Sequence, residues 1–269
     1  MIFNKVETIE RYQQIIERYY SKNGVSNDYL QRDAETLIKK GELLECCEEN
    51  NAYLLVKKTV GHRMYYYIND FNTIPNCSNI KDVVVEILYR GEPFYPQQEI
   101  GFLKNAGFKV NLTRDLYTGI YKDLVPPILN KNIEVRYTTT MEEVEFACNL
   151  FNISFDTLSG DYISQEEYST LFQNKSILIA TDRNQNLLGA LHQSFTGKVA
   201  CISHIVVLPE ARGYHVGQSL LNRFVENHME TEKSRYMFWV QQQNTAAVSM
   251  YQNCLLYTSP SPRDTERSR

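Results

Sequence analysis

The sequence lacks the features of a membrane protein and of a nucleic-acid-binding protein. None of its apolar runs approaches the ~20 residues of a membrane span, and the first residues, MIFNKVETIERYQQ, lack the long apolar core of a signal peptide. Positive charge is not in excess either, because 28 Lys and Arg stand against 32 Asp and Glu, which gives a net charge of −4. We therefore expect a cytoplasmic protein with neither a membrane nor a nucleic acid as its partner.

Patterns typical of metal sites and disulfide frameworks are also missing. The six cysteines contain no C-x-x-C spacing, and the five histidines show no spacing typical of metal ligands. We expect reduced thiols and no bound metal. No segment of 20 to 50 residues repeats, which excludes a solenoid.

The sequence does contain enough apolar material for two modest cores. It has 269 residues, of which 43% are hydrophobic and 12% aromatic. Two domains of ordinary size are the expectation for such a globular chain.

The most informative segment is IVVLPEARGYHVGQSLLNRF, residues 205–224, because its hydrophobic period changes midway. Before Pro209 it reads as a buried strand, and after Gly213 as an amphipathic helix with one apolar face. Residues 212–217 therefore lie at a turn that leads into a helix N-terminus, where free backbone N–H groups can converge on an anion. Arg212 would add a charge-assisted contact to a phosphate.

This segment resembles motif A of the GCN5-related N-acetyltransferases, which is Arg or Gln, two residues, Gly, one residue, and Gly or Ala after a strand. Here Arg212 and Gly217 match, whereas His215 stands in place of the first Gly. The Cβ of His215 should narrow the space for the pyrophosphate of acetyl-CoA. An ordinary strand-turn-helix connection is the alternative interpretation.

Residues 235–251, RYMFWVQQQNTAAVSMY, resemble motif B of the same family, a strand, an Asn, and a helix carrying Tyr about seven positions later. Asn244 also suits a helix N-cap. In the family this Tyr is assigned to protonate the leaving thiolate of coenzyme A, which makes Tyr251 a candidate catalytic acid. Taken alone, Tyr251 would more often be a core residue.

The element order of the second half agrees with this resemblance. A strand at 133–137 precedes two helices that open on capping boxes at Thr140/Glu143 and Ser164/Glu167, and three antiparallel strands follow at 176–181, 187–194 and 199–208. The resemblance, over residues 133 to 253, implies a mixed α+β fold of the GNAT type. It also implies that the strand of motif A separates from its neighbour, which leaves backbone groups free to pair with acetyl-CoA.

The implied activity is acetyl transfer from acetyl-CoA to a primary amine of a small molecule or peptide, by direct attack without a covalent enzyme intermediate. The implied cofactor-binding residues are Ile205, Val206, Val207, Arg212, Gly213, Tyr214, His215, Val216, Gly217 and Asn244. The alternative is a non-catalytic acyl-CoA-binding or protein-interaction module, which the His at position 215 favours.

The general base is not evident from the sequence. His204 lies on the strand of motif A and has a suitable ordinary pKa, although a lone His in an apolar strand is usually a core or edge residue. Asp161, Glu166 and Glu167 belong to the segment that shapes the acceptor site in the family, and the sequence does not rank them.

The first half shows a weaker copy of the same order. Helices are expected near 6–20, 29–40 and 96–105, and strands near 43–58, 63–68, 83–89 and 108–121. The segment FLKNAGF, residues 102–108, resembles the end of motif B, but Leu103 stands where the catalytic Tyr would be. We predict a divergent, non-catalytic GNAT-like domain over 1–128, an unrelated α+β domain being the alternative. A linker is expected at 125–132, before the acetyltransferase domain at 129–253.

The last residues, 254–269, read CLLYTSPSPRDTERSR and contain no strand-length apolar pattern. Their first eleven resemble a translated transposon-type sequencing adapter. We therefore predict that this tail is not native and that the domain is cut before its last two strands. The strand at 236–240 would then be an exposed edge, and the chain poorly soluble and inactive.

We expect the source locus, sequenced across codon 253, to continue as one residue, Gly and Phe followed by two apolar strands, because motif B should end in this way. A genomic copy of CLLYTSPSPRD would contradict the prediction.

Overall fold

The structure, a computed structural model, describes residues 1–28, 30–77, 81–120, 132–159, 162–229 and 235–254. It divides into two compact units, the first made of residues 1–110 with 157–160, and the second of residues 111–156 with 161–269. The predicted domain boundary at 128 and most of the predicted linker lie outside the described residues, as does the predicted tail beyond Cys254. Residues 111–120, which we expected in the first domain, are grouped with the second unit.

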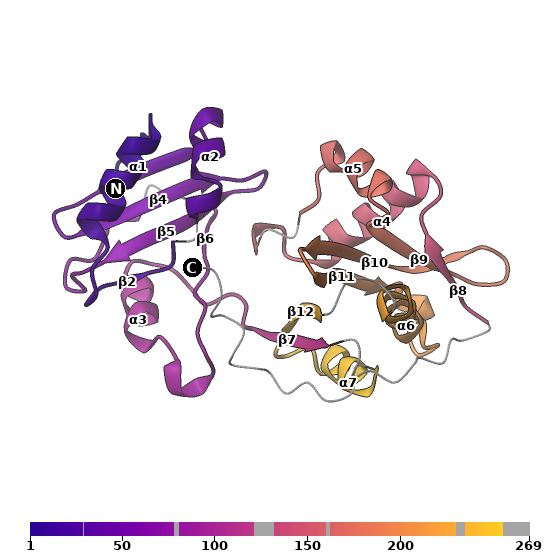
Figure 1. Cartoon of the computed structure of the whole chain (residues 1–269). Coiled ribbons are helices and arrows are strands. Elements are labelled where there is room, and N and C mark those ends of the chain that lie inside the picture. The colour runs from indigo at the N-terminus through magenta and orange to yellow at the C-terminus, as the bar shows by residue number, and fades with distance from the viewer. Residues whose placement is uncertain (29, 78–80, 121–131, 160–161, 230–234, 255–269) are drawn as a thin grey trace. The chain divides into compact units, whose positions relative to one another are not determined.

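The first unit is a mixed sheet with helices on both faces (Figure 1). The helices α1 and α2 pack on one face through Tyr12, Ile15 and Ala34, and α3 packs on the other through Phe102 and Leu103. Its elements in chain order are β1 (Asn4–Lys5), α1 (Ile9–Tyr19), β2 (Val25–Ser26), α2 (Ala34–Lys40), β3 (Leu43–Cys47), β4 (Asn51–Lys57), β5 (His62–Ile68), β6 (Val83–Val85) and α3 (Gln97–Asn105).

The second unit is a six-stranded sheet in the order β7-β12-β11-β10-β9-β8. The helices α4 and α5 cover one face, while α6 and α7 cover the other, where Leu220, Phe224 and Tyr251 enter the core (Figure 1). Its elements are β7 (Arg114–Ile120), β8 (Glu134–Tyr137), α4 (Met141–Ser154), α5 (Tyr168–Gln173), β9 (Ile177–Thr181), β10 (Leu187–Thr196), β11 (Val199–Val207), α6 (Val216–Met229), β12 (Arg235–Gln241) and α7 (Thr245–Cys254).

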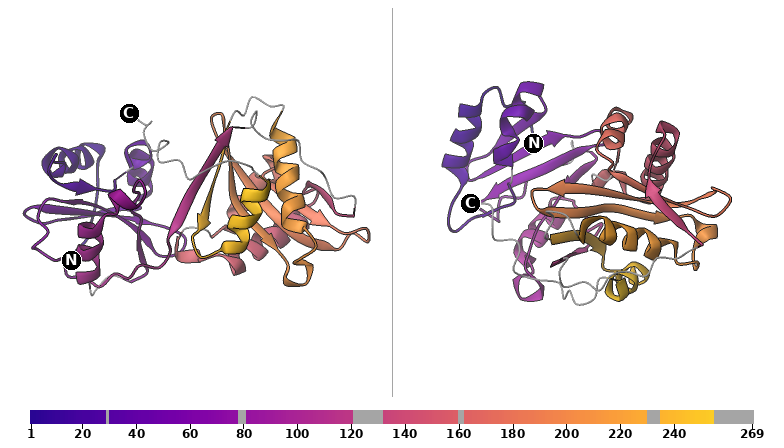
Figure 2. Two further views of the ribbon diagram at one scale, coloured as in Figure 1. Left: turned by 90° about the horizontal axis from the view of Figure 1, so that it is seen from below. Right: turned by 45° about the vertical axis from the view of Figure 1, so that its right-hand side comes forward.

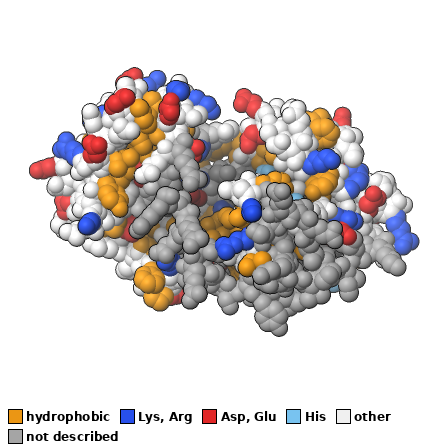
Figure 3. Space-filling model, viewed as in Figure 1, with side chains coloured by type: hydrophobic (Ala, Val, Ile, Leu, Met, Phe, Trp, Pro, Cys, Tyr) orange, Lys and Arg blue, Asp and Glu red, His pale blue; other side chains and the backbone are white. Residues whose placement is uncertain are grey.

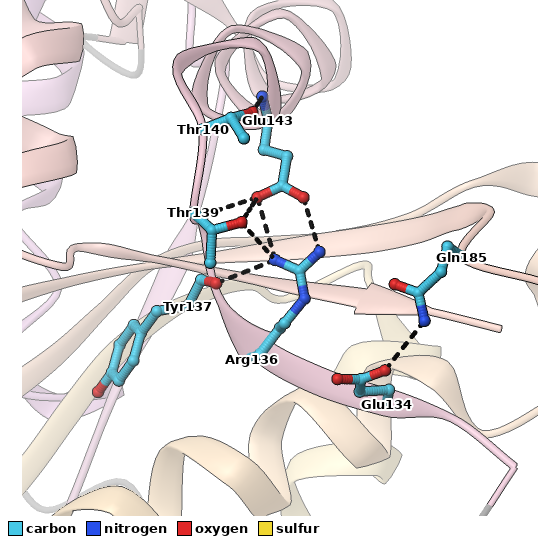
Figure 4. Close-up of polar contacts among 7 residues, drawn as sticks. All are labelled: Glu134, Arg136, Tyr137, Thr139, Thr140, Glu143 and Gln185. Atoms are coloured by element: carbon cyan, nitrogen blue, oxygen red, sulfur yellow. Dashed lines mark hydrogen bonds and ion pairs between the residues drawn. The ribbon is translucent and has the colours of Figure 1, made fainter. Parts of the chain in front are cut away.

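Glu143 fixes the corner between β8 and α4 (Figure 4). The Thr140 hydroxyl caps the helix by accepting a hydrogen bond from the Glu143 N–H, but the Glu143 side chain bonds to the Thr139 N–H and not to that of Thr140, so only half of the predicted capping box forms. The Glu143 carboxylate accepts two hydrogen bonds from the Arg136 guanidinium, at 3.0 and 2.7 Å, and one from the Thr139 N–H. The bond from Arg136 is the main reason that the pKa of Glu143 falls to about 2. These contacts set the direction of α4, which carries Phe151 to the middle of the sheet.

The predicted exposed edge at 236–240 is wrong, because β7 pairs antiparallel with β12 along its whole length (Figure 2). The expectation of a poorly soluble, inactive chain, which we drew from an unpaired edge, therefore loses its basis. Tyr117 lies opposite Phe238, and their rings stack with centroids 5.4 Å apart. Gly119 lies opposite Tyr236, whose ring occupies the space that a side chain at 119 would need. The tyrosine thus covers the gap left by the glycine, which explains the close fit of this strand.

The first unit resembles the second in element order. Both contain a strand, two helices, three antiparallel strands, a parallel strand and a helix, although β2 lies between the two helices of the first unit and β7 precedes β8 in the second. In the second unit, α6 lies between the third antiparallel strand and the parallel one. In the first unit the described residues between β5 and β6, 69–77 and 81–82, contain no helix. The prediction of a divergent GNAT-like domain agrees with this order.

In the first unit, β2 and the side chain of Asn27 pair with the part of β5 that extends beyond β6. The pairing of β5 with β6 covers only His62 to Met64, and Tyr67 and Ile68 pair instead with β2. Between these pairings the buried Asn27 side chain accepts a hydrogen bond from the Tyr66 N–H and donates to the Met64 carbonyl. This strand edge therefore has protein partners.

We expect Gly119→Ala to lower the free energy of unfolding by about 1–3 kcal/mol, because the added Cβ would overlap the Tyr236 ring and push β7 from β12. Thermal unfolding measures the effect. Gly101→Ala in α3 is the matched control, since a Cβ there meets nothing within 4 Å. An unchanged melting temperature for Gly119→Ala would contradict the pairing of β7 with β12.

Candidate functional site

The central feature of the second unit is the separation of its two parallel strands, β11 and β12. Their register runs from Val199 opposite Arg235 to Ile202 opposite Phe238 and ends there. Beyond this point β11 stays paired with β10 as far as Val207, and β12 stays paired with β7 as far as Gln241. Each strand follows its outer neighbour, so a gap opens between them, as the family resemblance predicted.

Ile205, Val206 and Val207 lie on the open part of β11 and are half-buried. Backbone N–H and C=O groups in such a place need a partner, which can be water or a bound ligand. The structure thus puts the three predicted strand contacts beside the opening.

The segment between β11 and α6 forms a tight, exposed turn. Arg212, Gly213, Tyr214 and His215 are all exposed, and the side chain of Tyr214 has 70% of its surface accessible. Gly213 has φ of 84° and His215 has φ of 62°, and α6 begins at the next residue. The first N–H groups of α6 have no partner within the helix, and its dipole makes this end positive.

The backbone conformation explains why His215 is an unusual residue at its position. A φ of 62° lies in the left-handed region that glycine adopts at little cost and other residues at a cost of ~1 kcal/mol. Its ring lies beside the helix, with Nδ1 3.1 Å from the Gln218 Oε1.

Val216 and Gly217 have packing roles that the sequence did not show. Val216 is in the core, with 1% of its surface exposed. A Cβ at Gly217 would lie 3.0 Å from the Met250 sulfur and 3.5 Å from a Val207 methyl, so this glycine lets α7 approach α6. A substitution at 217 would therefore disturb helix packing as well as a bound phosphate.

Asn244 is the N-cap of α7, as predicted. Its side-chain oxygen accepts a hydrogen bond from the Ala247 N–H at 3.1 Å, and its carbonyl accepts one from the Val248 N–H. The cap uses this side-chain oxygen, which leaves the amide N–H groups as the donors that Asn244 could offer to a ligand.

Tyr251 lies at the point where the strands separate. Its ring stacks on that of Phe238, with centroids 4.2 Å apart, and Phe238 is the last residue of β12 in register with β11. Only 5% of Tyr251 is exposed. Tyr251 therefore fills the core as well as standing next to the predicted site.

His204, the candidate base, lies on the face of the sheet covered by α4, and it is paired with a histidine that the sequence analysis missed. Its Nδ1 is 3.1 Å from the Nδ1 of His192 on β10. The rings of Phe151 and Phe155 lie 5.2 and 4.8 Å from its own. The sequence does not predict the pairing of His192 with His204, because a regular hairpin through Thr196 and Gly197 would put His192 opposite residue 203.

Two cavities are described, one in each unit. That of the first unit measures 350 Å³ and includes Tyr67 and Glu99 in its wall. That of the second unit measures 480 Å³ and is lined by Leu171, Asn174, Ser176, His192, Gln193, Ser194 and Phe195. Neither of these two cavities is lined by a predicted cofactor-binding residue.

Of the three acidic candidates for catalysis, the two that the structure describes line neither cavity. Glu167 accepts hydrogen bonds from the Ser164 N–H and hydroxyl at 2.8 and 2.9 Å, which forms the predicted capping box. Glu166 is exposed, and Asp161 is not among the described residues.

The described residues contain no group of three or more His, Cys, Asp or Glu side chains suited to a metal ion, and no helix long and apolar enough to span a bilayer. Acidic and basic side chains are interspersed over the face shown in Figure 3.

Comparisons with known proteins find one family-model match, which lies within the second unit. Residues 144–255 match the family model of the acetyltransferase (GNAT) family. A search of curated sequences finds no match.

Solved structures of similar fold include a GCN5-related N-acetyltransferase from Sphaerobacter thermophilus, at 12% identity and a TM-score of 0.56, covering 89% of this chain and 93% of that one. One from Kribbella flavida, at 13% identity and a TM-score of 0.52, covers 80% and 85%. A fungal multi-domain β-N-acetylglucosaminidase with a GCN5-related glucosamine N-acetyltransferase region matches at 10% identity and a TM-score of 0.62, over 94% of this chain but 36% of its own length.

These likenesses show the fold over most of the chain, while the family match covers the strand opening, the turn and the helix N-terminus described above. Residues 144–255 thus form a domain that matches the acetyltransferase (GNAT) family.

Proposed function

We propose that the second unit binds acetyl-CoA and transfers its acetyl group to a primary amine of a small molecule or peptide by direct attack. The observation that carries the proposal is the opening between β11 and β12 directly before the N-terminus of α6. An extended, amide-bearing ligand with a phosphate end needs both features, in this order along the chain.

The residues at this opening fit acetyl-CoA. The open edge of β11 at Ile205 to Val207 can pair with the amide groups of the pantetheine arm, as an added strand would. The turn from Arg212 to His215 and the first N–H groups of α6 can hold the pyrophosphate, and Arg212 adds a positive charge. Acetyl-CoA supplies the activated acyl group, and the protein supplies binding, orientation and proton transfer.

Direct transfer needs a donor to the oxyanion, an acid for the thiolate and a base for the amine. Backbone N–H groups of the open β11 edge can serve as the donor. Tyr251 is the candidate acid, because its helix places it against Phe238, where the opening begins. His204 and its partner His192 provide imidazole nitrogens on the same sheet.

A non-catalytic acyl-CoA-binding module is the second candidate. The burial of Tyr251 in the core favours it, since a tyrosine that stacks on Phe238 and is 5% exposed already has a structural role. His215 in the left-handed region is consistent with a weakened phosphate site. Turnover, as opposed to binding, distinguishes the two functions.

For binding, we expect Arg212→Ala to raise the Kd for acetyl-CoA roughly tenfold, because a charge-assisted contact is worth about 1.5–3 kcal/mol. His215→Gly should lower the Kd several-fold, since it removes a Cβ and relieves the backbone. The fluorescence of Trp239, the one tryptophan of the chain, reports binding, because Trp239 follows Phe238 on the separated part of β12.

Arg183→Ala is the matched control, because Arg183 lies in the β9–β10 turn and bonds to Asn132. If Arg212→Ala and His215→Gly both leave the Kd unchanged, the phosphate site is not at this turn.

For turnover, we expect Tyr251→Phe to lower kcat about 10²- to 10⁴-fold with little change in the Kd for acetyl-CoA, because losing an acid affects the transition state. Thiol release from acetyl-CoA across a panel of primary amines measures it. Phe keeps the ring that stacks on Phe238, so the fold should be preserved. A Phe variant with wild-type turnover would leave Tyr251 a core residue only.

A further inference from the structure

The pair formed by His192 and His204 has a geometry that constrains its protons. Their Nδ1 atoms are 3.1 Å apart and their rings are nearly parallel, at 16°. Two nitrogens at this distance form a hydrogen bond only if one carries the proton and the other offers a lone pair. The rings must therefore hold different tautomers, or one of them must be charged.

A β-bulge creates this pair. In the β10–β11 ladder His192 lies opposite His204, but the next residue, Gln193, lies opposite Ile202, so Ser203 is the extra residue. Without the bulge His192 would face Ser203. Bulges of this kind redirect side chains and are common beside active sites.

The two histidines differ in their surroundings. His204 is 7% exposed and lies against the rings of Phe151 and Phe155. His192 lines the 480 Å³ cavity together with Asn174, Ser176 and Ser194, among others. His192 is thus the ring of the pair that a molecule in the cavity can reach.

The groups packed around His192 favour its neutral form. From α4 it meets the ring of Phe151, from α5 the cavity wall includes Leu171, and from β11 it meets His204. Burial, and then the charge of His204, lower the pKa of His192 to about 4. At neutral pH the ring is therefore uncharged and keeps one nitrogen lone pair.

The described cavity wall contains no carboxylate. In this half-open cavity an ammonium ion would gain no counter-charge from the lining residues to offset the hydration that it gives up, whereas an uncharged amine needs none. The cavity therefore suits an amine that binds in its neutral form, such as an arylamine or another amine of low basicity.

We propose that His192 is the catalytic residue that takes the proton of the attacking amine in this cavity, and that His204 is a positioning residue that accepts a hydrogen bond from the His192 Nδ1–H. This inference rests on the proposed acetyl transfer. It replaces His204 by His192 as the base. The tautomer with hydrogen on Nδ1 leaves the lone pair on Nε2 of His192.

In the proposed step, the amine attacks the thioester of acetyl-CoA and loses a proton to His192. The amine nitrogen forms a bond to the acyl carbon of the thioester, and that nitrogen becomes strongly acidic as it acquires positive charge. Its proton passes to His192 Nε2, the carbon–sulfur bond breaks, and the thiolate takes a proton from the acid, which then regains one from water. The imidazolium of His192 then releases its proton to water, which its lowered pKa favours.

NMR of the ¹⁵N-labelled wild-type chain tests the tautomers without relying on activity, with signals assigned by single histidine variants. We expect His192 to carry its proton on Nδ1 at pH 7 and to stay neutral until the pH falls near 4, and His204 to carry its proton on Nε2. A His192 that carries its proton on Nε2 at pH 7 would overturn the proposal.

Steady-state kinetics with acetyl-CoA and an arylamine of low basicity tests whether His192 is the base and His204 positions it. We expect His192→Phe to lower kcat at least 10²-fold with an unchanged Kd for acetyl-CoA. His204→Asn, which keeps a hydrogen-bond acceptor, should retain more activity than His204→Phe. His62→Gln in the first unit is the histidine control, and unchanged melting temperatures show that the variants fold.

The outcomes separate the two proposals. A wild-type chain that binds acetyl-CoA but acetylates none of the amines overturns the proposed function and this inference with it. An active chain whose His192→Phe variant keeps the wild-type kcat overturns this inference alone.

Discussion

The divergence of β11 from β12 is the constraint on which the second unit depends. Pairing stops at Ile202 and Phe238 because each strand stays paired with its outer neighbour, β10 or β7. A gap in the middle of a sheet leaves backbone groups that must find partners, so it is stable only with water or a ligand in place. The turn and the α6 N-terminus follow directly from the open strand, which makes the opening and the anion-binding end parts of one feature.

The two units differ in what pairs with the third antiparallel strand beyond its parallel neighbour. In the first unit, β2 and the Asn27 side chain supply partners to the edge of β5 beyond its pairing with β6. No helix corresponding to α6 follows β5 among the described residues. Protein groups thus pair with this edge of β5, and Leu103 packs in the core of this unit. That the first unit is non-catalytic stays a prediction.

The histidine pair lies on the face of the sheet opposite α6, and several distant contacts determine it. Arg136 and Glu143 fix the start of α4, and α4 brings Phe151 against His204. The bulge at Ser203 then aligns His204 with His192. His204 is next to Ile205, the first of the proposed acetyl-CoA contacts, so the proposed acceptor site and acyl-donor site would meet at this point of β11.

Local signals in the sequence determined most elements and several site positions. The period change at Pro209, the capping residues Thr140, Ser164 and Asn244, and the spacing from Asn244 to Tyr251 act within a few residues, so they could be read from the sequence. Tertiary structure alone decided that β7 covers β12, that Gly217 makes room for Met250, and that His192 meets His204. These depend on strand register and on packing between segments far apart in the chain, and a one-residue bulge is enough to change which side chains face each other.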